Sequence, residues 1–218
     1  MPSITRPRRN AERREEIEQN LLRAVEALLA EGWSFTELSV QRIAEEAGIP
    51  RSTFYLHFPD KAQLLMRLTG RVYDEVFGET LAWWTGDHRD GPEGMTRALE
   101  GVITRYRLHF PVLRAVTEVA GYEPAVGAFY RSRILEFAAG MEARLRLAHE
   151  AGQLRPDVDI PATTQIMCWS TERSITEHIL GDPEGAGDHR VAEALARVQW
   201  LTMYGDARRP PAPIRRGP

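Results

Sequence analysis

The stretch that decides the fold runs from Leu38 to Lys61 and reads LSVQRIAEEAGIPRSTFYLHFPDK. Ser39 is a suitable N-cap for a short helix, and Gly48 is suited to the left-handed conformation that ends such a helix. Pro50 then permits a second helix to start, and Pro59 keeps that helix short. Two short helices joined by a glycine turn form a helix-turn-helix, in which the second helix enters the major groove of DNA.

The chain on either side of this stretch repeats its apolar residues at the helical period, which predicts an all-α protein. A long helix over residues 10–31 precedes the stretch, and a linking helix over residues 60–84 follows it. Glycines and a proline between residues 86 and 94 then mark a candidate domain boundary. Beyond it the periodicity predicts five more helices, at residues 93–109, 111–120, 123–151, 160–181 and 188–204.

Length and composition exclude several classes of protein. The 218 residues are 43% hydrophobic and 27% charged, as in an ordinary globular protein with a substantial core. The uncharged stretch Ile160–Thr171 is too short to span a bilayer. Cys168 is the single cysteine, so no internal disulfide can form, and no apolar segment that could serve as a signal peptide follows the N-terminus. We therefore expect a cytoplasmic protein without membrane association.

Charge is distributed unevenly along the chain. Residues 1–14 contain five arginines and one glutamate, which predicts a flexible basic arm that is either a solvated tail or a phosphate-seeking segment. Residues 206–218 contain four prolines and four arginines, which predicts a disordered tail. Residues 1–61 nevertheless hold nine basic and ten acidic side chains, so binding of DNA must depend on local placement, with the acids facing away from phosphates.

The same stretch resembles the N-terminal signature of the TetR family of bacterial repressors over about residues 25–68. The matching positions are Ile43-Ala44, Ala47-Gly48, Thr53-Phe54-Tyr55, Phe58-Pro59 and Lys61. The resemblance implies a helix-turn-helix DNA-binding domain over residues 15–61 and a helical ligand-binding and dimerisation domain over residues 62–205, with about nine helices in all. Pro50 departs from the serine of many members, so one potential phosphate contact is missing there.

Arg51 is the side chain that we expect to read a base, because arginine bidentate to guanine is the commonest specific contact in a major groove. Gln41 and Ser52 are the next candidates for base reading. By matching position, the resemblance implies that five further side chains contact the DNA backbone: Ser39, Thr53, Tyr55, His57 and Lys61. A partly packed ring that touches no DNA is the alternative for His57.

The last predicted helix carries only two charged residues from Val191 to Tyr204, and its apolar residues lie on every side. Such a helix needs cover on every side, which predicts a two-fold homodimer through the last two helices, with Leu195 and Val198 in the interface. Complete burial within one subunit is the alternative. In such a dimer the two helix-turn-helix domains are related by a two-fold axis, which predicts a palindromic operator.

Apolar and aromatic stripes on the middle helices are most often ordinary core. The segment Cys168–Arg190 and the ending Trp200–Gly205, however, resemble the EthR-like branch of the family, whose second domain contains a long apolar tunnel. By matching position, the tunnel here would be lined by Leu99, Ile103, Tyr106, Phe110, Tyr130, Ile134, Phe137, Met141, Cys168, Thr171 and Trp200. The resemblance thus implies a repressor that a small apolar effector releases from its operator. The alternative is a DNA-binding regulator with a solid, ligand-free dimerisation domain.

Catalysis finds little support in the sequence. Cys168 has no histidine at a useful helical offset, because His178, ten residues on, points roughly a hundred degrees or more away. Gly185-Ala186-Gly187 follows no predicted strand, which argues against a dinucleotide site. The sequence contains no recognisable metal-binding motif. We therefore predict no enzyme activity, no cofactor and no metal.

Overall fold

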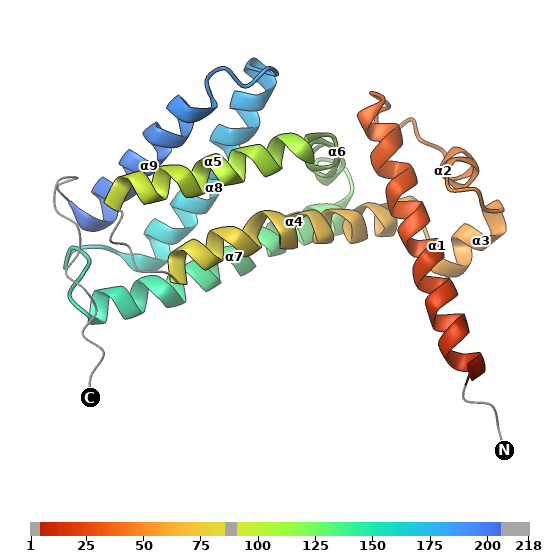
Figure 1. The fold of residues 1–218 in the computed structure, drawn as a ribbon, viewed down its shortest axis with the longest axis horizontal. Coiled ribbons are helices and arrows are strands. Elements are labelled where there is room, and N and C mark those ends of the chain that lie inside the picture. Colours follow the sequence, from red (N-terminus) through yellow and green to blue (C-terminus); the bar gives the residue numbers. More distant parts are fainter. Residues whose placement is uncertain (1–4, 86–90, 206–218) are drawn as a thin grey trace. The chain divides into compact units, whose positions relative to one another are not determined.

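The computed structural model describes residues 5–85 and 91–205, and side chains from 12 to 78 and from 91 to 205. All regular elements in these ranges are α-helices (Figure 1). In chain order they are α1 (Thr5–Ala30), α2 (Val40–Glu46), α3 (Arg51–His57), α4 (Lys61–Thr85), α5 (Gly91–Leu108), α6 (Phe110–Ala120), α7 (Pro124–Glu150), α8 (Ile160–Gly181) and α9 (Asp188–Tyr204). The predicted fold class is confirmed for these residues. None of the described helices combines the length and hydrophobicity that a bilayer span requires.

The helix bounds follow the sequence pattern closely, and α8 and α9 span the predicted residues. The largest difference lies at the N-terminus, where α1 begins at Thr5 instead of near residue 10. Part of the expected flexible arm is therefore helical. Pro7 falls within the first turn of α1, where the backbone amide that proline lacks would have no helical partner. Residues 1–4 of the expected arm and the expected tail at residues 206–218 lie outside the described residues.

The chain forms two compact units, each assembled from two separate segments. The first unit contains the residues up to Val72 together with Phe110–Tyr130, so that α6 packs with the N-terminal helices. The second unit contains Tyr73–His109 and the chain from Arg131 onward. Two helices, α4 and α7, therefore contribute to both units. The division predicted at residue 61 remains a prediction, and the structure adds that α6 groups with the helix-turn-helix.

The core of the first unit lies where α1 meets α2, α3 and α6. Leu21 and Val25 of α1, Ile43 of α2 and Phe54 of α3 are completely buried there. Gly48 joins the two short helices with φ +67°, a left-handed conformation that a side chain would strain. This backbone conformation confirms the glycine turn expected from the sequence.

In the second unit, α5 packs along α9, and α8 contacts both helices. The face of α9 that meets this core carries Ala192, Ala196, Trp200 and Met203, all of which are buried. The ring of Trp200 lies 4.3 Å from that of Tyr204, measured between centroids. Apolar surface removed from water stabilises this three-helix arrangement.

Lys61, the first residue of α4, holds together the segment that leads into α2. Its Nζ donates hydrogen bonds to the carbonyl oxygens of Phe35 (3.0 Å), Thr36 (2.9 Å) and Leu38 (3.0 Å). An ammonium has three N–H bonds, so all of its donors are engaged in this arrangement, which we call the Lys61 clamp. Burial lowers the pKa of Lys61 below its ordinary value. The clamp satisfies carbonyls that lie outside any helix.

Replacing Lys61 tests the clamp. Lys61→Met should lower the free energy of unfolding by about 1 to 3 kcal/mol, because partly buried carbonyls lose a charged donor. Arg67→Met is the matched control on the same helix, since exposed Arg67 binds Glu18 at 2.6 Å and should cost less than about 1 kcal/mol. Urea denaturation followed by circular dichroism measures both variants. Equal losses in the two would contradict the clamp.

Candidate functional site

The outer face of α3 presents three of the predicted DNA-binding side chains. Arg51, Ser52 and Tyr55 are exposed, whereas Thr53 and His57 are half-buried. The guanidinium carbon of Arg51 lies 5.8 Å from the centroid of the Tyr55 ring, and its Nη2 is 3.4 Å from the phenol oxygen. The cation is thus oriented by a neighbouring ring and keeps donors for an acceptor outside the protein. Arg51 therefore remains a candidate for base reading.

Ser39 and Pro50 define the starts of the two short helices. The Oγ of Ser39 accepts the amide N–H of Arg42 at 3.1 Å and so caps α2, as the sequence predicted. This bond uses the serine as acceptor, so its hydroxyl proton remains able to reach a phosphate. Pro50 precedes α3 without any side-chain cap, which confirms the departure noted in the sequence.

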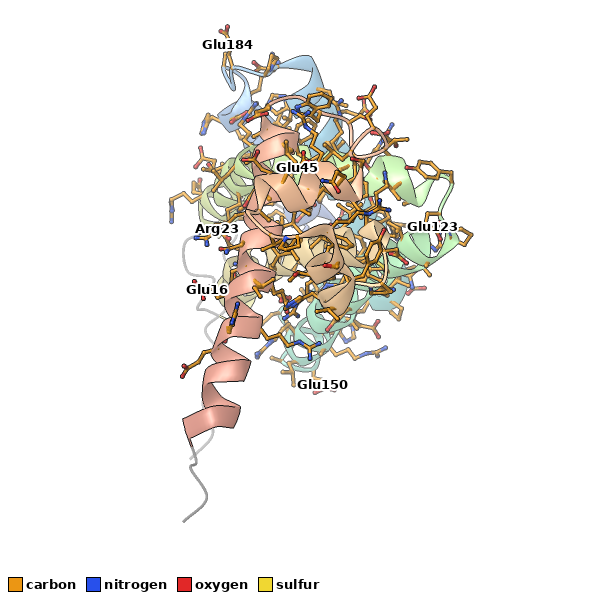
Figure 2. The ribbon with its side chains drawn as sticks, turned by 90° about the vertical axis from the view of Figure 1, so that its right-hand side faces the viewer. Glu16, Arg23, Glu45, Glu123, Glu150 and Glu184 are labelled. Carbon is orange, nitrogen blue, oxygen red and sulfur yellow. The ribbon has the colours of Figure 1, made fainter. Side chains whose placement is uncertain are left out.

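Gln41 has a partner that sequence reasoning missed. Its Nε2 donates to Oε1 of Glu45 at 2.6 Å, one turn along α2. Figure 2 shows Glu45 at the surface of α2, and Glu16 and Arg23 at the surface of α1. Binding of DNA requires the acids of residues 1–61 to face away from phosphates, but the carboxylate of Glu45 lies beside the amide of Gln41, a candidate for base reading. A carboxylate here could accept from the amino group of cytosine, and it would repel a phosphate.

His57 matches the packed-ring alternative more closely than a cationic DNA contact. Its buried Nδ1 has no hydrogen-bond partner among the described residues. Burial lowers the pKa of His57 below its ordinary value of 6.5, the positive charge of Arg14 lowers it further, and Glu18 opposes the shift. The ring is therefore neutral at pH 7 and brings no charge toward a phosphate.

A surface hollow in the first unit brings together Ser39, Tyr55 and Lys61 from the predicted set. Asp60 lies on the same hollow and caps α4, since its Oδ1 accepts the amide of Gln63 at 2.8 Å. The predicted phosphate contact of Lys61 conflicts with the clamp, because all three of its donors already bind carbonyls. Lys61 positions the segment before α2 instead.

The second candidate site is a cavity inside the second unit, with about 610 Å³ of empty space including the part open to solvent. Helices α4, α5, α7, α8 and α9 contribute to its walls. Seven of the predicted tunnel residues line it: Leu99, Tyr106, Ile134, Phe137, Met141, Cys168 and Thr171. A mostly apolar lining with a few polar side chains is typical of a small-molecule site.

Four predicted tunnel residues do not line this cavity. Phe110 and Tyr130 belong to the first unit, where Phe110 lines a separate surface pocket beside Trp33. Ile103 and Trp200 are completely buried in the core of the second unit, and neither of them is among the residues that line the cavity. Matching positions placed Ile103, Tyr130 and Trp200 on helices that contribute to the cavity, but at positions that do not line it, whereas Phe110 belongs to α6, which does not contribute to the wall.

Eight lining residues were missed by the sequence analysis: Phe77, Met95, Ala98, Val102, Met167, Glu172, Ile175 and Gln199. Helical spacing could have found Met95 and Val102, which lie on one face of α5 with Leu99 and Tyr106. No pattern could have found the polar members, because a glutamate and a glutamine on these helices look like solvent-facing positions. Gln199 donates from Nε2 to Oγ1 of Thr171 at 2.7 Å.

Cys168 lies in the wall of the cavity and is buried. Burial raises the pKa of its thiol to about 12. The thiol is therefore protonated at physiological pH and is a poor nucleophile, because the thiolate is the reactive form. Its environment suits packing against an apolar ligand.

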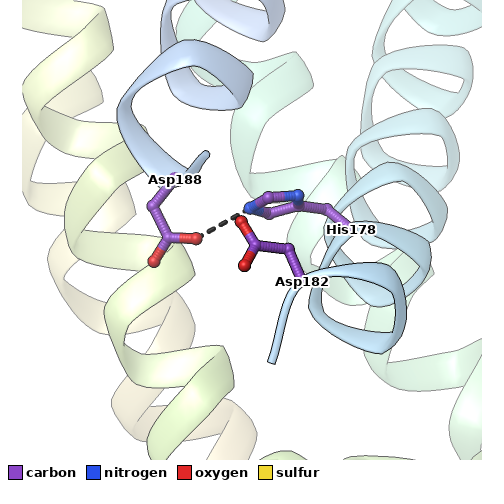
Figure 3. A group of neighbouring side chains, drawn as sticks. All are labelled: His178, Asp182 and Asp188. Atoms are coloured by element: carbon purple, nitrogen blue, oxygen red, sulfur yellow. Dashed lines mark hydrogen bonds and ion pairs between the residues drawn. The ribbon is translucent and has the colours of Figure 1, made fainter. Parts of the chain in front are cut away.

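His178, Asp182 and Asp188 form the cluster in Figure 3, with ligand atoms within 4.8 Å of one another. Their polar atoms already make hydrogen bonds within the protein. Arg107 of α5 donates to both carboxylate oxygens of Asp188, at 2.7 Å from Nε and 2.6 Å from Nη2. The carboxylate of Asp182 accepts the amides of Gly185 and Gly187 at 3.0 Å and 2.7 Å. A guanidinium inside the cluster disfavours a metal ion, and the cluster fixes the α8–α9 connection against α5.

Comparisons with known proteins agree with the helix-turn-helix geometry. Residues 21–68 match the family model described as bacterial regulatory proteins, tetR family. The HTH-type transcriptional regulator EthR of Mycolicibacterium smegmatis is 24% identical over 206 residues, which are 92% of each chain.

Solved structures show the same fold over most of the chain. A TetR-family transcriptional regulator from Mesorhizobium loti has a TM-score of 0.69 at 16% identity, over 88% of this chain and 98% of that one. The fatty acid degradation regulator FadR of Bacillus halodurans has a TM-score of 0.67 at 16% identity, over 84% and 94%. Together with the helix-turn-helix and its glycine turn, these likenesses show that residues 21–68 match the tetR family model and that the chain is similar to the transcriptional regulator EthR over most of its length.

Proposed function

We propose that this chain is a homodimeric repressor that binds a palindromic operator and is released by a small apolar effector. The observation that carries the proposal is the apolar cavity in the second unit of a chain whose first unit holds a helix-turn-helix. A cavity of this kind favours an effector-responsive regulator over one with a solid dimerisation domain.

The DNA contact in this proposal depends on α3. Arg51 reads a base, with Ser52 and Gln41 as further candidates, because these side chains are exposed on the two short helices. Phosphate contacts come from three other polar side chains on the same surface, which fix the register: Ser39, Thr53 and Tyr55.

Dimerisation is supported by apolar side chains exposed on the last two helices. Ile166 of α8 is 68% exposed and Val198 of α9 is 64% exposed. Leu195 is half-buried, and Leu201 of α9 is exposed. A second copy related by a two-fold axis would cover these side chains, and the two reading heads would then require a palindromic operator.

Effector response is transmitted through α4 in this proposal. The helix begins in the first unit at Lys61 and places Phe77 on the cavity wall in the second unit. A ligand that displaces α4 changes the separation of the two helix-turn-helix units of the dimer. This separation must match major grooves about 34 to 36 Å apart. A complete switch requires about 5.5 kcal/mol of preference for the released form.

Arg51→Ala tests base reading. The variant should lose about 1 to 3 kcal/mol of specific binding and tolerate substitution at one base pair per half-site. Arg23→Ala, which removes an exposed arginine of α1 that binds Asn20, is the matched control. Gel-shift titration against an operator selected from a random duplex library measures both. Retained specificity in Arg51→Ala would remove Arg51 from base reading.

Val198→Glu tests the interface. Burying an unpaired carboxylate at a two-fold contact costs several kcal/mol, so the variant should be monomeric. Leu147→Glu changes an exposed leucine of α7 and should leave the dimer intact. Sedimentation velocity distinguishes the two states. A dimer of undiminished stability in Val198→Glu would place the interface elsewhere.

Thr171→Trp tests the effector site. The indole should fill the cavity and weaken binding of the neutral dye N-phenyl-1-naphthylamine about tenfold or more. It should also either lower operator affinity without ligand or leave DNA binding unresponsive to the dye. Thr104→Trp, on the exposed face of α5, is the control. Unchanged dye binding, operator affinity and response in Thr171→Trp would contradict an effector site here.

A further inference from the structure

One side chain on the exposed face of α3 is large and apolar. Leu56 is 76% exposed, the highest fraction among the exposed large apolar side chains of the described residues. A single exposed leucine is ordinary on a protein surface. The position of Leu56 distinguishes it, because it lies on the short helix that also presents Arg51, Ser52 and Tyr55.

Helix geometry places Leu56 on the side of α3 that faces away from the core. Phe54 is completely buried and marks the inner side of the helix. Ser52 precedes Phe54 by two residues and Leu56 follows it by two, so each lies roughly 160° around the helix axis from Phe54. Ser52 and Leu56 are also one turn apart, which makes them neighbours on the outer side. A DNA groove that receives α3 must therefore meet Leu56.

The chemistry of leucine limits what this side chain can contact in a groove. It has no atom that can donate to a phosphate or to the polar edge of a base. The apolar group that a base presents in the major groove is the 5-methyl group of thymine. Contact with this methyl group removes apolar surface of both partners from water, and no other base offers the same gain.

We propose that Leu56 is a specificity-determining residue that packs against the 5-methyl group of a thymine in the operator. This inference rests on the proposed function, since it adds a second base-reading contact on the helix that binds the operator. Leu56 follows Arg51 by five residues, a rise of about 7.5 Å, and successive base pairs are about 3.4 Å apart. The thymine therefore lies within about two base pairs of the base that Arg51 contacts.

Deoxyuridine tests the contact, because it pairs as thymidine does and lacks only the 5-methyl group. Each thymine in one half-site of an operator selected from a random duplex library is replaced in turn, and fluorescence anisotropy measures binding of the full chain. One replacement should weaken wild-type binding about fourfold, the loss expected for one buried methyl group. Its position should lie within about two base pairs of the one at which Arg51→Ala loses specificity.

Two variants of Leu56 and one control assign the methyl contact. In Leu56→Ala the deoxyuridine penalty at that thymine should fall below about twofold, because the apolar contact is removed. Leu56→Met keeps an apolar side chain of similar size and should retain most of the penalty. Leu108→Ala is the matched control, since Leu108 is 69% exposed at the end of α5 in the second unit, and it should keep the full penalty.

The outcomes separate the inference from the proposed function. An undiminished penalty in Leu56→Ala would assign the methyl contact to another side chain and overturn the inference, as would an operator in which no thymine shows a penalty. Loss of the dimer in Leu56→Ala without DNA, measured by sedimentation velocity, would place Leu56 between copies and would also overturn it. Failure of the selection to yield any bound duplex would overturn the proposed operator binding itself.

Discussion

The first unit, which contains the helix-turn-helix, depends on the ammonium group of Lys61. The segment between α1 and α2 has carbonyl oxygens that no helix can satisfy, and Lys61 supplies donors to three of them. The same segment ends at Ser39, which caps α2, so the position of the first short helix follows from the clamp. Because Lys61 is also the first residue of α4, the start of the long helix and the start of α2 are fixed to each other.

The second unit is subject to a different constraint, because its apolar packing stops short of filling the space between its helices. Trp200 and Ile103 are packed completely, whereas the neighbouring faces of α5, α7 and α8 leave a cavity. The Arg107–Asp188 pair holds α5 against the beginning of α9. Hydrogen bonding to Arg107 lowers the pKa of Asp188 below its ordinary value, so this contribution to stability is present at neutral pH and is lost as the pH falls below about 4.

Much of the fold could be predicted from the sequence because helix signals are local. The caps and glycines around α2 and α3, and the bounds of α8 and α9, follow from residue type and period. Which face of a helix packs against which other helix does not follow from local sequence, because it depends on residues far apart in the chain. Phe110 continues the apolar spacing of α5, but it is the first residue of α6, which packs against α1. Glu172 has a charged side chain of the kind found at surface positions, but it lines the cavity. Lys61 was assigned by its charge, whereas its three carbonyl partners lie more than twenty residues earlier in the sequence.

The interleaving of the two units has a consequence for synthesis of the chain on the ribosome. α1 packs against α6, and the hydroxyl of Thr36 makes hydrogen bonds with Glu118 and Tyr122. The first unit is therefore incomplete until residue 130 has been synthesised. At about 5 to 20 residues per second, translation from residue 72 to residue 130 takes roughly 3 to 12 seconds. During that interval the buried face of α1 that will receive α6 stays open to water or to a chaperone. A nascent chain stalled before α6 would therefore contain α3, while the first unit to which α3 belongs has not finished folding.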